Sequence, residues 1–467
     1  MKKQADQLPL VLLIILPLVI VFALDLTPYS TSIKTLWKSL NTSALNDDKE
    51  TWLRSANTIL SYQPWQVELW NQVAQKEFEL ENHAEVIRSY NTILEYQPLT
   101  VEQSIFLSQS YLATGRLEKS DELWDEIIDA PDVRPEQLKH LFQIQQSAGD
   151  WLGAYRTIYR WHQLEPDQAE VQRQLVLAQI LFEPVKAVES INTFRLSEFK
   201  PILVELDTIV STDNPTYQLV IAGNIYSRLG EWEYALQAFS KVVELDPNYA
   251  EGWAFYGNAL MNTGENGFFA LDKAINLSPT SKISKAYLAS YWRDQNDLAK
   301  SIDIYKDLIH EEENQPVWYH ELGKTYILNG DTEKALTAFQ KTTELAPTNI
   351  YYWLYLAKFS GDFRLEIQTV GMPAARQAML IDDENWEVFD VLGWLYLLEM
   401  DYTSAERFFS NAFGIAPENP MVNLHLGQLY SLQNRDDLAN YYLERCINHT
   451  DDLELIELAN KFLRPSK

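Results

Sequence analysis

The sequence predicts an all-α protein, an array of stacked helix pairs preceded by one transmembrane helix. The array follows from prolines that recur at or near multiples of 34 residues, each closing a run of helix-forming sequence. The transmembrane helix follows from an uncharged apolar run, residues 8–24. The recurring prolines are Pro64, Pro98, Pro166, Pro247, Pro279, Pro347 and Pro417. Because such helix pairs bury their apolar faces only against their neighbours, we expect function to come from a surface rather than a pocket.

Three segments repeat one pattern of small and large residues. The three sets are Leu219, Ala222, Gly223, Tyr226, Gly230, Ala235, Phe239 and Pro247; Tyr319, Leu322, Gly323, Tyr326, Gly330, Ala335, Phe339 and Pro347; and Phe389, Leu392, Gly393, Tyr396, Ala405, Phe409, Ala412 and Pro417. In this pattern the chain resembles the tetratricopeptide repeat family. The resemblance implies a right-handed superhelical solenoid of helix-turn-helix repeats. It also implies a close approach of the two helices at the first glycine of each set, with the first alanine after the turn facing it.

The repeat register divides the chain into segments. These are a cytoplasmic tail (1–7), a transmembrane anchor or signal peptide (8–26), a linker (27–49), a repeat array with an amino-terminal cap (50–168), a second array (216–349), a third array (386–453) and a carboxy-terminal cap or tail (454–467). Two segments between the arrays, residues 169–215 and 350–385, depart from the repeat pattern and are called the departures. Residues 169–215 are too long for one repeat, and Pro184, Pro201 and Pro215 suggest an extra helix. We interpret both departures as degenerate repeats, the alternative being joints or binding elements.

Residues 8–26 are predicted to meet a membrane. Seventeen helical residues would span about 25 Å, slightly less than a hydrocarbon core of roughly 30 Å, so length alone does not separate an anchor from a signal peptide cleaved after Ala23. We favour a retained anchor. Two lysines before the run favour a cytoplasmic amino terminus, although Lys34 and Lys38 weaken the asymmetry. The prediction is a single-pass cell-membrane protein with most of its chain outside the cytoplasm.

The composition is strongly acidic. The formal net charge is -28, from 66 acidic and 38 basic residues, which disfavours nucleic acid as a partner. The acidity is interpreted as keeping a long array soluble, and the alternative is attraction of a basic partner. The single cysteine, Cys446, cannot form an intrachain disulfide and is expected to be buried and inert.

No sequence motif points to catalysis. The chain has no phosphate-binding loop, no nucleophile elbow and no dinucleotide fingerprint. Its seven histidines are scattered, without metal-ligand spacing. The sequence therefore predicts a protein that is not an enzyme and binds neither a metal nor another cofactor.

The candidate binding residues come from the first helix of each pair, which lines the concave groove in the family that the chain resembles. The groove position two residues before Tyr226 holds Asn224, and 34 residues later the same position holds Asn258; two stacked amides would suit the backbone of an extended peptide. The alternative is that this position simply faces water. The groove is expected to be more apolar and aromatic, with Trp394 and Asp390 together, and the lysine clamp by which related repeats hold a terminal carboxylate is not recognisable. The candidates are Asn224, Asn258, Lys324, Asp390, Trp394 and Gln428.

These observations predict a non-catalytic, membrane-tethered scaffold of the cell envelope that binds an apolar or amphipathic protein segment in its groove. The alternative is an accessory factor for envelope polysaccharide assembly or export, which would add glycan as a ligand through exposed aromatics such as Trp318, Trp386 and Trp394. An enzymatic site within 169–215 or 350–385 would require clustered buried carboxylates.

Overall fold

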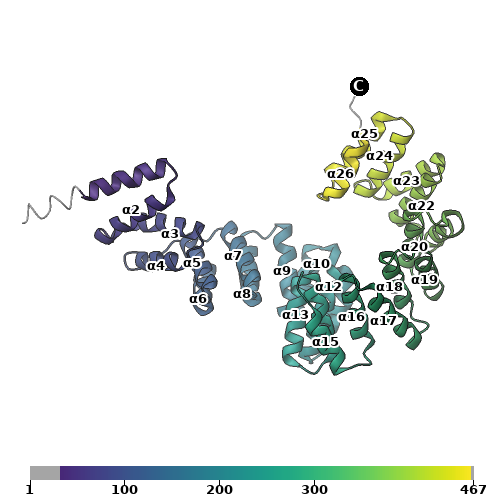
Figure 1. Cartoon of the computed structure of the whole chain (residues 1–467), viewed down its shortest axis with the longest axis horizontal. Helices are drawn as coiled ribbons and strands as arrows, with labels where there is room; N and C mark the ends of the chain where they lie inside the picture. Colours follow the sequence, from purple (N-terminus) through teal and green to yellow (C-terminus); the bar gives the residue numbers. More distant parts are fainter. Residues whose placement is uncertain (1–31, 464–467) are drawn as a thin grey trace, which may run out of the picture. The chain divides into compact units, whose positions relative to one another are not determined.

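The computed structural model describes residues 32–463, and its regular elements in this range are all helices. By internal contacts the chain divides into two compact units, residues 1–238 and 239–467, and each unit is described here by itself. The predicted tail and anchor, residues 1–26, lie outside the described residues. Within residues 32–463, no helix combines the length and the apolar character needed to cross a bilayer. Figure 1 shows the helices following one another in chain order.

The first unit begins with a helix over residues 32–45 and continues as helix pairs joined by short turns. Its elements are α2 (Lys49–Tyr62), α3 (Val67–Glu79), α4 (His83–Leu94), α5 (Val101–Ala113), α6 (Leu117–Asp129), α7 (Pro135–Ala148), α8 (Trp151–Leu164), α9 (Ala169–Phe182), α10 (Pro184–Phe194), the 3-10 helix η1 (Ser197–Ile202), α11 (Leu203–Ser211) and α12 (Pro215–Leu229). Two clusters of its apolar core lie within residues 40–111 and 105–178, and buried apolar side chains continue along the later helices.

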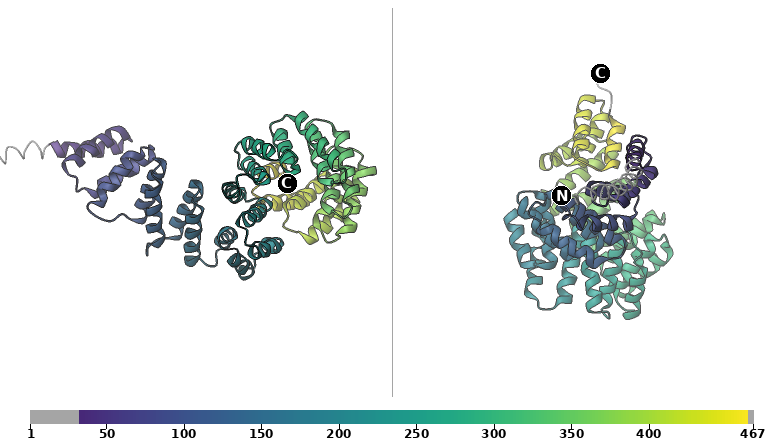
Figure 2. Two further views of the ribbon diagram at one scale, coloured as in Figure 1. Left: turned by 90° about the horizontal axis from the view of Figure 1, so that it is seen from below. Right: turned by 90° about the vertical axis from the view of Figure 1, so that its left-hand side faces the viewer.

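The second unit continues the same arrangement after α13 (Trp232–Leu245), in which the boundary between the units falls. Its elements are α14 (Ala250–Asn262), α15 (Phe268–Leu277), α16 (Lys282–Asp294), α17 (Leu298–Glu311), α18 (Pro316–Leu328), α19 (Thr332–Leu345), α20 (Ile350–Asp362), the π-helix η2 (Ile367–Gly371), α21 (Met372–Ile381), α22 (Trp386–Leu398), α23 (Tyr402–Ile415), α24 (Pro420–Leu432), α25 (Asp436–Asn448) and α26 (Leu453–Phe462). Figure 2 shows these helices winding around a curve. Cys446 is buried near the end of this stack, as expected.

The helices of a pair meet where the sequence places a glycine. A Cβ atom added to Gly393 would lie 2.6 Å from Cδ1 of Phe409, and one added to Gly323 would lie 2.7 Å from Cζ of Phe339. The predicted close approach is therefore present. The facing group differs from the prediction, because the phenylalanine ring rather than the alanine supplies the three nearest atoms. The ring occupies the space that a side chain on the first helix would fill.

The repeated prolines also tie each pair to the next one. The proline typically stands two residues beyond the last residue of the second helix, so its carbonyl needs a partner outside that helix. In five repeats a side chain six residues later, on the next first helix, donates a hydrogen bond of 2.7 to 3.0 Å to that carbonyl. The donors are Trp70, Gln172, Trp253, Trp353 and Asn423. Each such bond contributes on the order of 1 kcal/mol and fixes the turn between pairs.

The two predicted departures have distinct local structures. Residues 169–215 form α9, α10, η1 and α11, with Pro184 in the first turn of α10 and Pro201 inside η1. Residues 350–385 form α20, η2 and α21. The turn between α20 and η2 places Arg364 and Glu366 at positive φ, 51° and 49°, where a non-glycine residue is uncommon.

Candidate functional site

The structure places the six candidate residues on the first helices of their pairs. Asn224 is exposed on α12 of the first unit, whereas the other five belong to the second unit. Because Asn224 and Asn258 lie in different units, the stacking of their amides stays a prediction. Asn258 already accepts hydrogen bonds from the Asn262 amide, at 2.8 Å through its backbone carbonyl and 3.4 Å through its side-chain oxygen.

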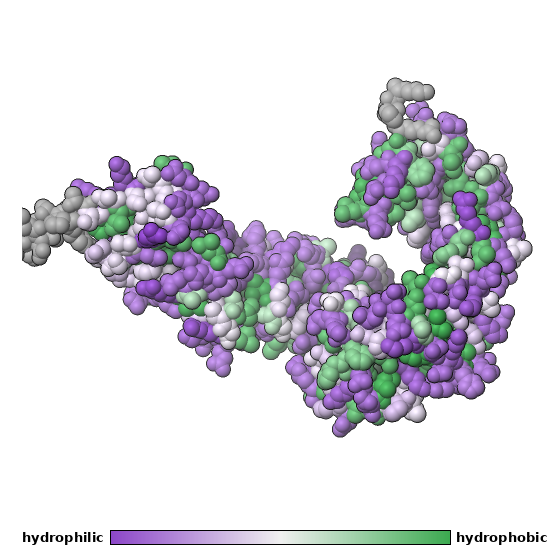
Figure 3. Space-filling model, in the orientation of Figure 1, coloured by the Kyte–Doolittle hydropathy of each residue, from purple (hydrophilic) through white to green (hydrophobic). Residues whose placement is uncertain are grey.

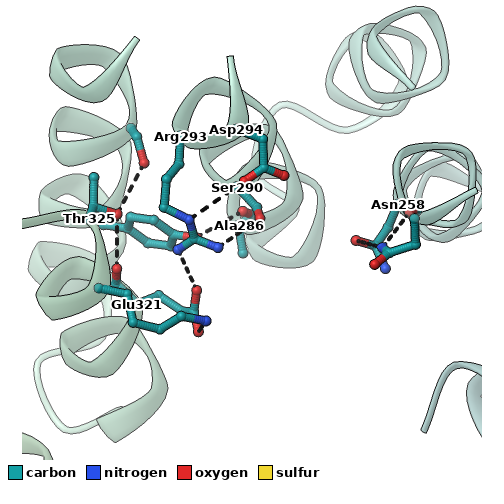
Figure 4. Close-up of polar contacts among 11 residues, drawn as sticks. Asn258, Ala286, Ser290, Arg293, Asp294, Glu321 and Thr325 are labelled. Atoms are coloured by element: carbon teal, nitrogen blue, oxygen red, sulfur yellow. Dashed lines mark hydrogen bonds and ion pairs between the residues drawn. The ribbon is translucent and has the colours of Figure 1, made fainter. Parts of the chain in front are cut away.

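Lys324 belongs to a network of charged groups across the groove face of α16 and α18. Its Nζ atom lies 3.0 Å from Glu321, which also accepts a hydrogen bond of 2.6 Å from Arg293. Figure 4 shows Arg293 reaching across to Glu321, with Asn258 on a separate helix away from the pair. Burial raises the pKa of the Glu321 carboxyl, but Lys324 and Arg293 outweigh burial and hold its pKa below the usual value. Lys324 is therefore engaged within the protein, which the sequence did not indicate.

The three remaining candidates line one pocket of about 450 Å³ between α20, α22, α24 and α26. The sequence predicted function from a surface of the array, and this part of that surface is hollowed. We call this hollow the α22 pocket. It is lined by Lys358, Asp362, Trp386, Glu387, Asp390, Val391, Trp394, Met421, Leu424, His425, Gln428, Leu455 and Leu458. Figure 3 shows hydrophobic residues exposed among hydrophilic ones on the carboxy-terminal helices.

Asp390 is held in the wall of the α22 pocket by a histidine from the next repeat. The carboxylate is only 4% exposed, and its two oxygens accept a hydrogen bond from Nδ1 of His425 at 2.9 and 3.0 Å. The two residues are 35 positions apart, close to one repeat, so the repeat period alone could have paired them. A buried carboxylate with a hydrogen-bonded partner gives the pocket a fixed polar wall.

The other charged groups stand on α20 and α22. Lys358 donates a hydrogen bond to Glu387, which joins these two helices. Asp362 is partly shielded, and burial raises the pKa of its carboxyl, with Lys358 acting in the opposite direction. Neither Asp362 nor Gln428 has a hydrogen-bond partner among residues 32–463.

The indole of Trp394 packs against a glycine of residues 350–385. A Cβ atom on Gly361 would overlap the six-membered ring of Trp394. The missing side chain in the last turn of α20 therefore makes the room that the indole occupies. Trp386 also lines the pocket, whereas the indole of Trp318 is buried and donates a hydrogen bond of 3.0 Å to Glu312.

The arrangement has the chemistry of a binding site. Apolar and aromatic walls surround a few polar groups, as in sites that bury an apolar ligand and orient it. The lining residues include no serine, threonine or cysteine, so the Asp390–His425 pair has no nucleophile beside it. Within residues 32–463, no group of three or more histidines, cysteines or carboxylates could hold a metal ion.

Comparison with known proteins identifies the repeats. The tetratricopeptide repeat family matches residues 219–249 and, in a second match, residues 319–349. These are two of the three segments whose patterns the sequence singled out.

Two curated relatives illustrate the range of proteins that share such repeats. The human mitochondrial import receptor subunit TOM70 is 27% identical over 139 residues, which cover 29% of this chain and 22% of the receptor. Cellulose synthase operon protein C of Pseudomonas fluorescens (strain SBW25) is 21% identical over 307 residues, which cover 62% of this chain and 23% of that protein. The matched stretches thus span about a fifth of the length of these relatives.

Solved structures also resemble the chain. Yeast Tom70 aligns with 78% of this chain and 95% of its own, at 14% identity and a TM-score of 0.36. A tetratricopeptide repeat protein from Parabacteroides merdae aligns with 53% of this chain and 98% of its own, at 13% identity and a TM-score of 0.40.

Proposed function

Because residues 219–249 and 319–349 are tetratricopeptide repeats, we propose that this chain is a scaffold that binds a protein partner in the α22 pocket. The observation that carries the proposal is the convergence of Asp390, Trp394 and Gln428 in one hollow. All three occupy groove positions that the repeat register predicts from the sequence. Their meeting supports a site built from the first helices of adjacent repeats.

The indole of Trp394 is the proposed anchor of the interaction. Tryptophans in desolvated pockets are among the residues whose truncation weakens protein complexes most. Gln428 supplies two donors and one acceptor, which suit the unpaired backbone groups of a bound segment. The Asp390–His425 pair fixes the wall between them.

The membrane tether is a second part of the proposal and rests on the sequence of residues 8–26 alone. A retained anchor would confine the repeats to a membrane surface and raise their effective concentration near membrane partners. Placement of most of the chain outside the cytoplasm rests on the two lysines that precede the apolar run.

Purification of the full chain from its native membrane in mild detergent tests the proposal. Beside it stand a pocket variant, Trp394→Ala with Gln428→Ala, and a control variant, Trp65→Ala, which removes an exposed indole of the first unit. We expect a stoichiometric polypeptide to accompany the wild type and the control and to be absent from the pocket variant. The same polypeptide at equal yield in all three preparations would contradict the assignment.

A glycan ligand is the second candidate, favoured by the presence of both Trp386 and Trp394 in one pocket. Two indoles in one hollow could stack on the faces of sugar rings. Mass spectrometry of the same preparations separates the two candidates. Bound oligosaccharide without a polypeptide, lost from the pocket variant, would support a role in polysaccharide assembly or export instead.

A further inference from the structure

The α22 pocket also indicates the chemistry of its partner, and this inference rests on the proposed function. We infer that the bound segment carries an apolar side chain with a lysine or arginine beside it. The apolar side chain would enter between Trp394 and the leucines of α26, and the cation would meet Asp362. The partner is thus a basic amphipathic segment, the opposite of an acidic tail.

The apolar part of the inference follows from the walls. Trp394, Leu424 and Leu455 come from three different helices and face the same hollow. Met421 and Leu458, which also line it, each keep 36% of their surface exposed. An apolar side chain that filled the hollow would remove this surface from water, which is the main favourable contribution available here.

The charged part follows from an imbalance in the pocket. Its lining contains three carboxylates, one lysine and one histidine. Glu387 is hydrogen-bonded by Lys358 and Asp390 by His425, so both carboxylates are already compensated. Asp362 has no such partner among the described residues, although burial works against its ionised form. A cation brought by the partner would pair with the one lining carboxylate that has no hydrogen-bond or ion-pair partner among the described residues.

An acidic partner is disfavoured both by the charges in the pocket and by the net charge of the whole chain. Within the pocket its carboxylates would approach the unpaired carboxylate of Asp362, and like charges close together repel. Over the whole chain the net charge of -28 would slow its approach, whereas the same field would attract a basic segment. Gln428 is neutral and tolerates either sign, so it contributes hydrogen bonds rather than selectivity.

The inference is tested by measuring how tightly a set of peptide probes binds to the full chain in detergent. Each fluorescein-labelled probe carries Leu, Phe or Trp as an anchor and, at varied spacing, Lys, Gln or Glu as the neighbour. We expect the best Lys probes to bind at least about fivefold more tightly than their Gln partners, and Glu probes to bind most weakly. For Asp362→Asn we expect equal binding of Lys and Gln probes. The control Asp303→Asn, an exposed aspartate of α17, should keep the wild-type preference.

The outcomes separate this inference from the function on which it rests. Probes that require Trp394 but bind equally with Lys, Gln and Glu would overturn the inference and leave the binding pocket standing. A Lys preference that survives in Asp362→Asn would overturn the assigned role of Asp362. Binding of every probe that is indifferent to Trp394→Ala, in a variant with an unchanged helical circular dichroism spectrum, would overturn the pocket and the inference together.

Discussion

Acidification should destabilise the second unit through one buried histidine. His320 on α18 is 4% exposed, and its ring centroid lies 4.5 Å from that of Tyr355 and 5.6 Å from that of Phe339. Its Nε2 atom lies 3.4 Å from the Tyr351 hydroxyl. Burial lowers the pKa of the imidazole from 6.5 to about 4, because a charged ring would lose its water among these aromatic side chains.

The sign and size of the effect follow from this pKa. Above about pH 6.5 the imidazole is neutral in both the folded and the unfolded chain, so its contribution to stability is fully present. As the pH falls from 6.5 towards 4, the His320 imidazole binds a proton in the unfolded chain but not in the folded chain, so the free energy of unfolding decreases. The whole loss is about 3 kcal/mol, of which about 2 kcal/mol falls above pH 5.

Chemical denaturation followed by circular dichroism at pH 7 and pH 5 measures this loss. For His320→Gln, the free energy of unfolding should fall less between the two pH values than in the wild type, by about 2 kcal/mol. The control His449→Gln replaces an exposed histidine that directly follows α25, and it should behave as the wild type. Equal pH dependence in the wild type and His320→Gln would refute the reasoning.

Three further predictions concern packing, the charged network and the thiol. Gly323→Ala should lower the free energy of unfolding by about 1–3 kcal/mol because the new methyl group meets the facing phenylalanine ring. The control Gly414→Ala places its methyl group in open space and should not lower it. Urea denaturation of both variants measures this difference. Arg293→Met should cost about 2 kcal/mol by leaving Glu321 without its arginine, and adding Glu321→Leu should restore most of the loss in a double-mutant cycle. Burial raises the pKa of the Cys446 thiol, so iodoacetamide should modify it only after unfolding, and labelling of the native chain at the rate of free cysteine would be inconsistent with this burial.

The sequence predicted the helix pairs well because the residues that end the helices and allow them to approach act locally. A proline ends a helix wherever it stands, and a glycine marks a close approach through its own missing side chain. The identity of the facing residue was harder to predict. Gly393 meets Phe409 because the ring reaches back along its own helix, a direction that spacing alone does not give.

The candidate site was predictable where it follows the repeat period. Trp394 and Gln428 are 34 residues apart, so equivalent positions of adjacent repeats were bound to be neighbours. The rest depends on contacts without a period. Lys324 is engaged by Glu321 within its own helix, and Glu321 in turn binds Arg293 of the preceding repeat. Leu455 reaches the pocket from α26, a final helix whose sequence lacks the repeat pattern.

The departure at 350–385 shows what the pattern cannot reveal. The sequence predicts only a degenerate repeat here, yet Gly361 is the residue that makes room for Trp394. The π-helix η2 follows two residues at positive φ, and such distortions are frequent at functional sites. A deviation from the repeat therefore contributes to the shape of the candidate site.

Site-specific photocross-linking in the native cell tests the central claim, that the α22 pocket holds a protein partner. The photoreactive residue p-benzoylphenylalanine would replace Gln428 inside the pocket and, as the control, Asp437 at the surface of the second helix of the same pair. The account predicts one discrete cross-linked polypeptide from position 428, lost when Trp394→Ala is added, and none from position 437. The same products from both positions, or a product at 428 that persists without Trp394, would contradict it.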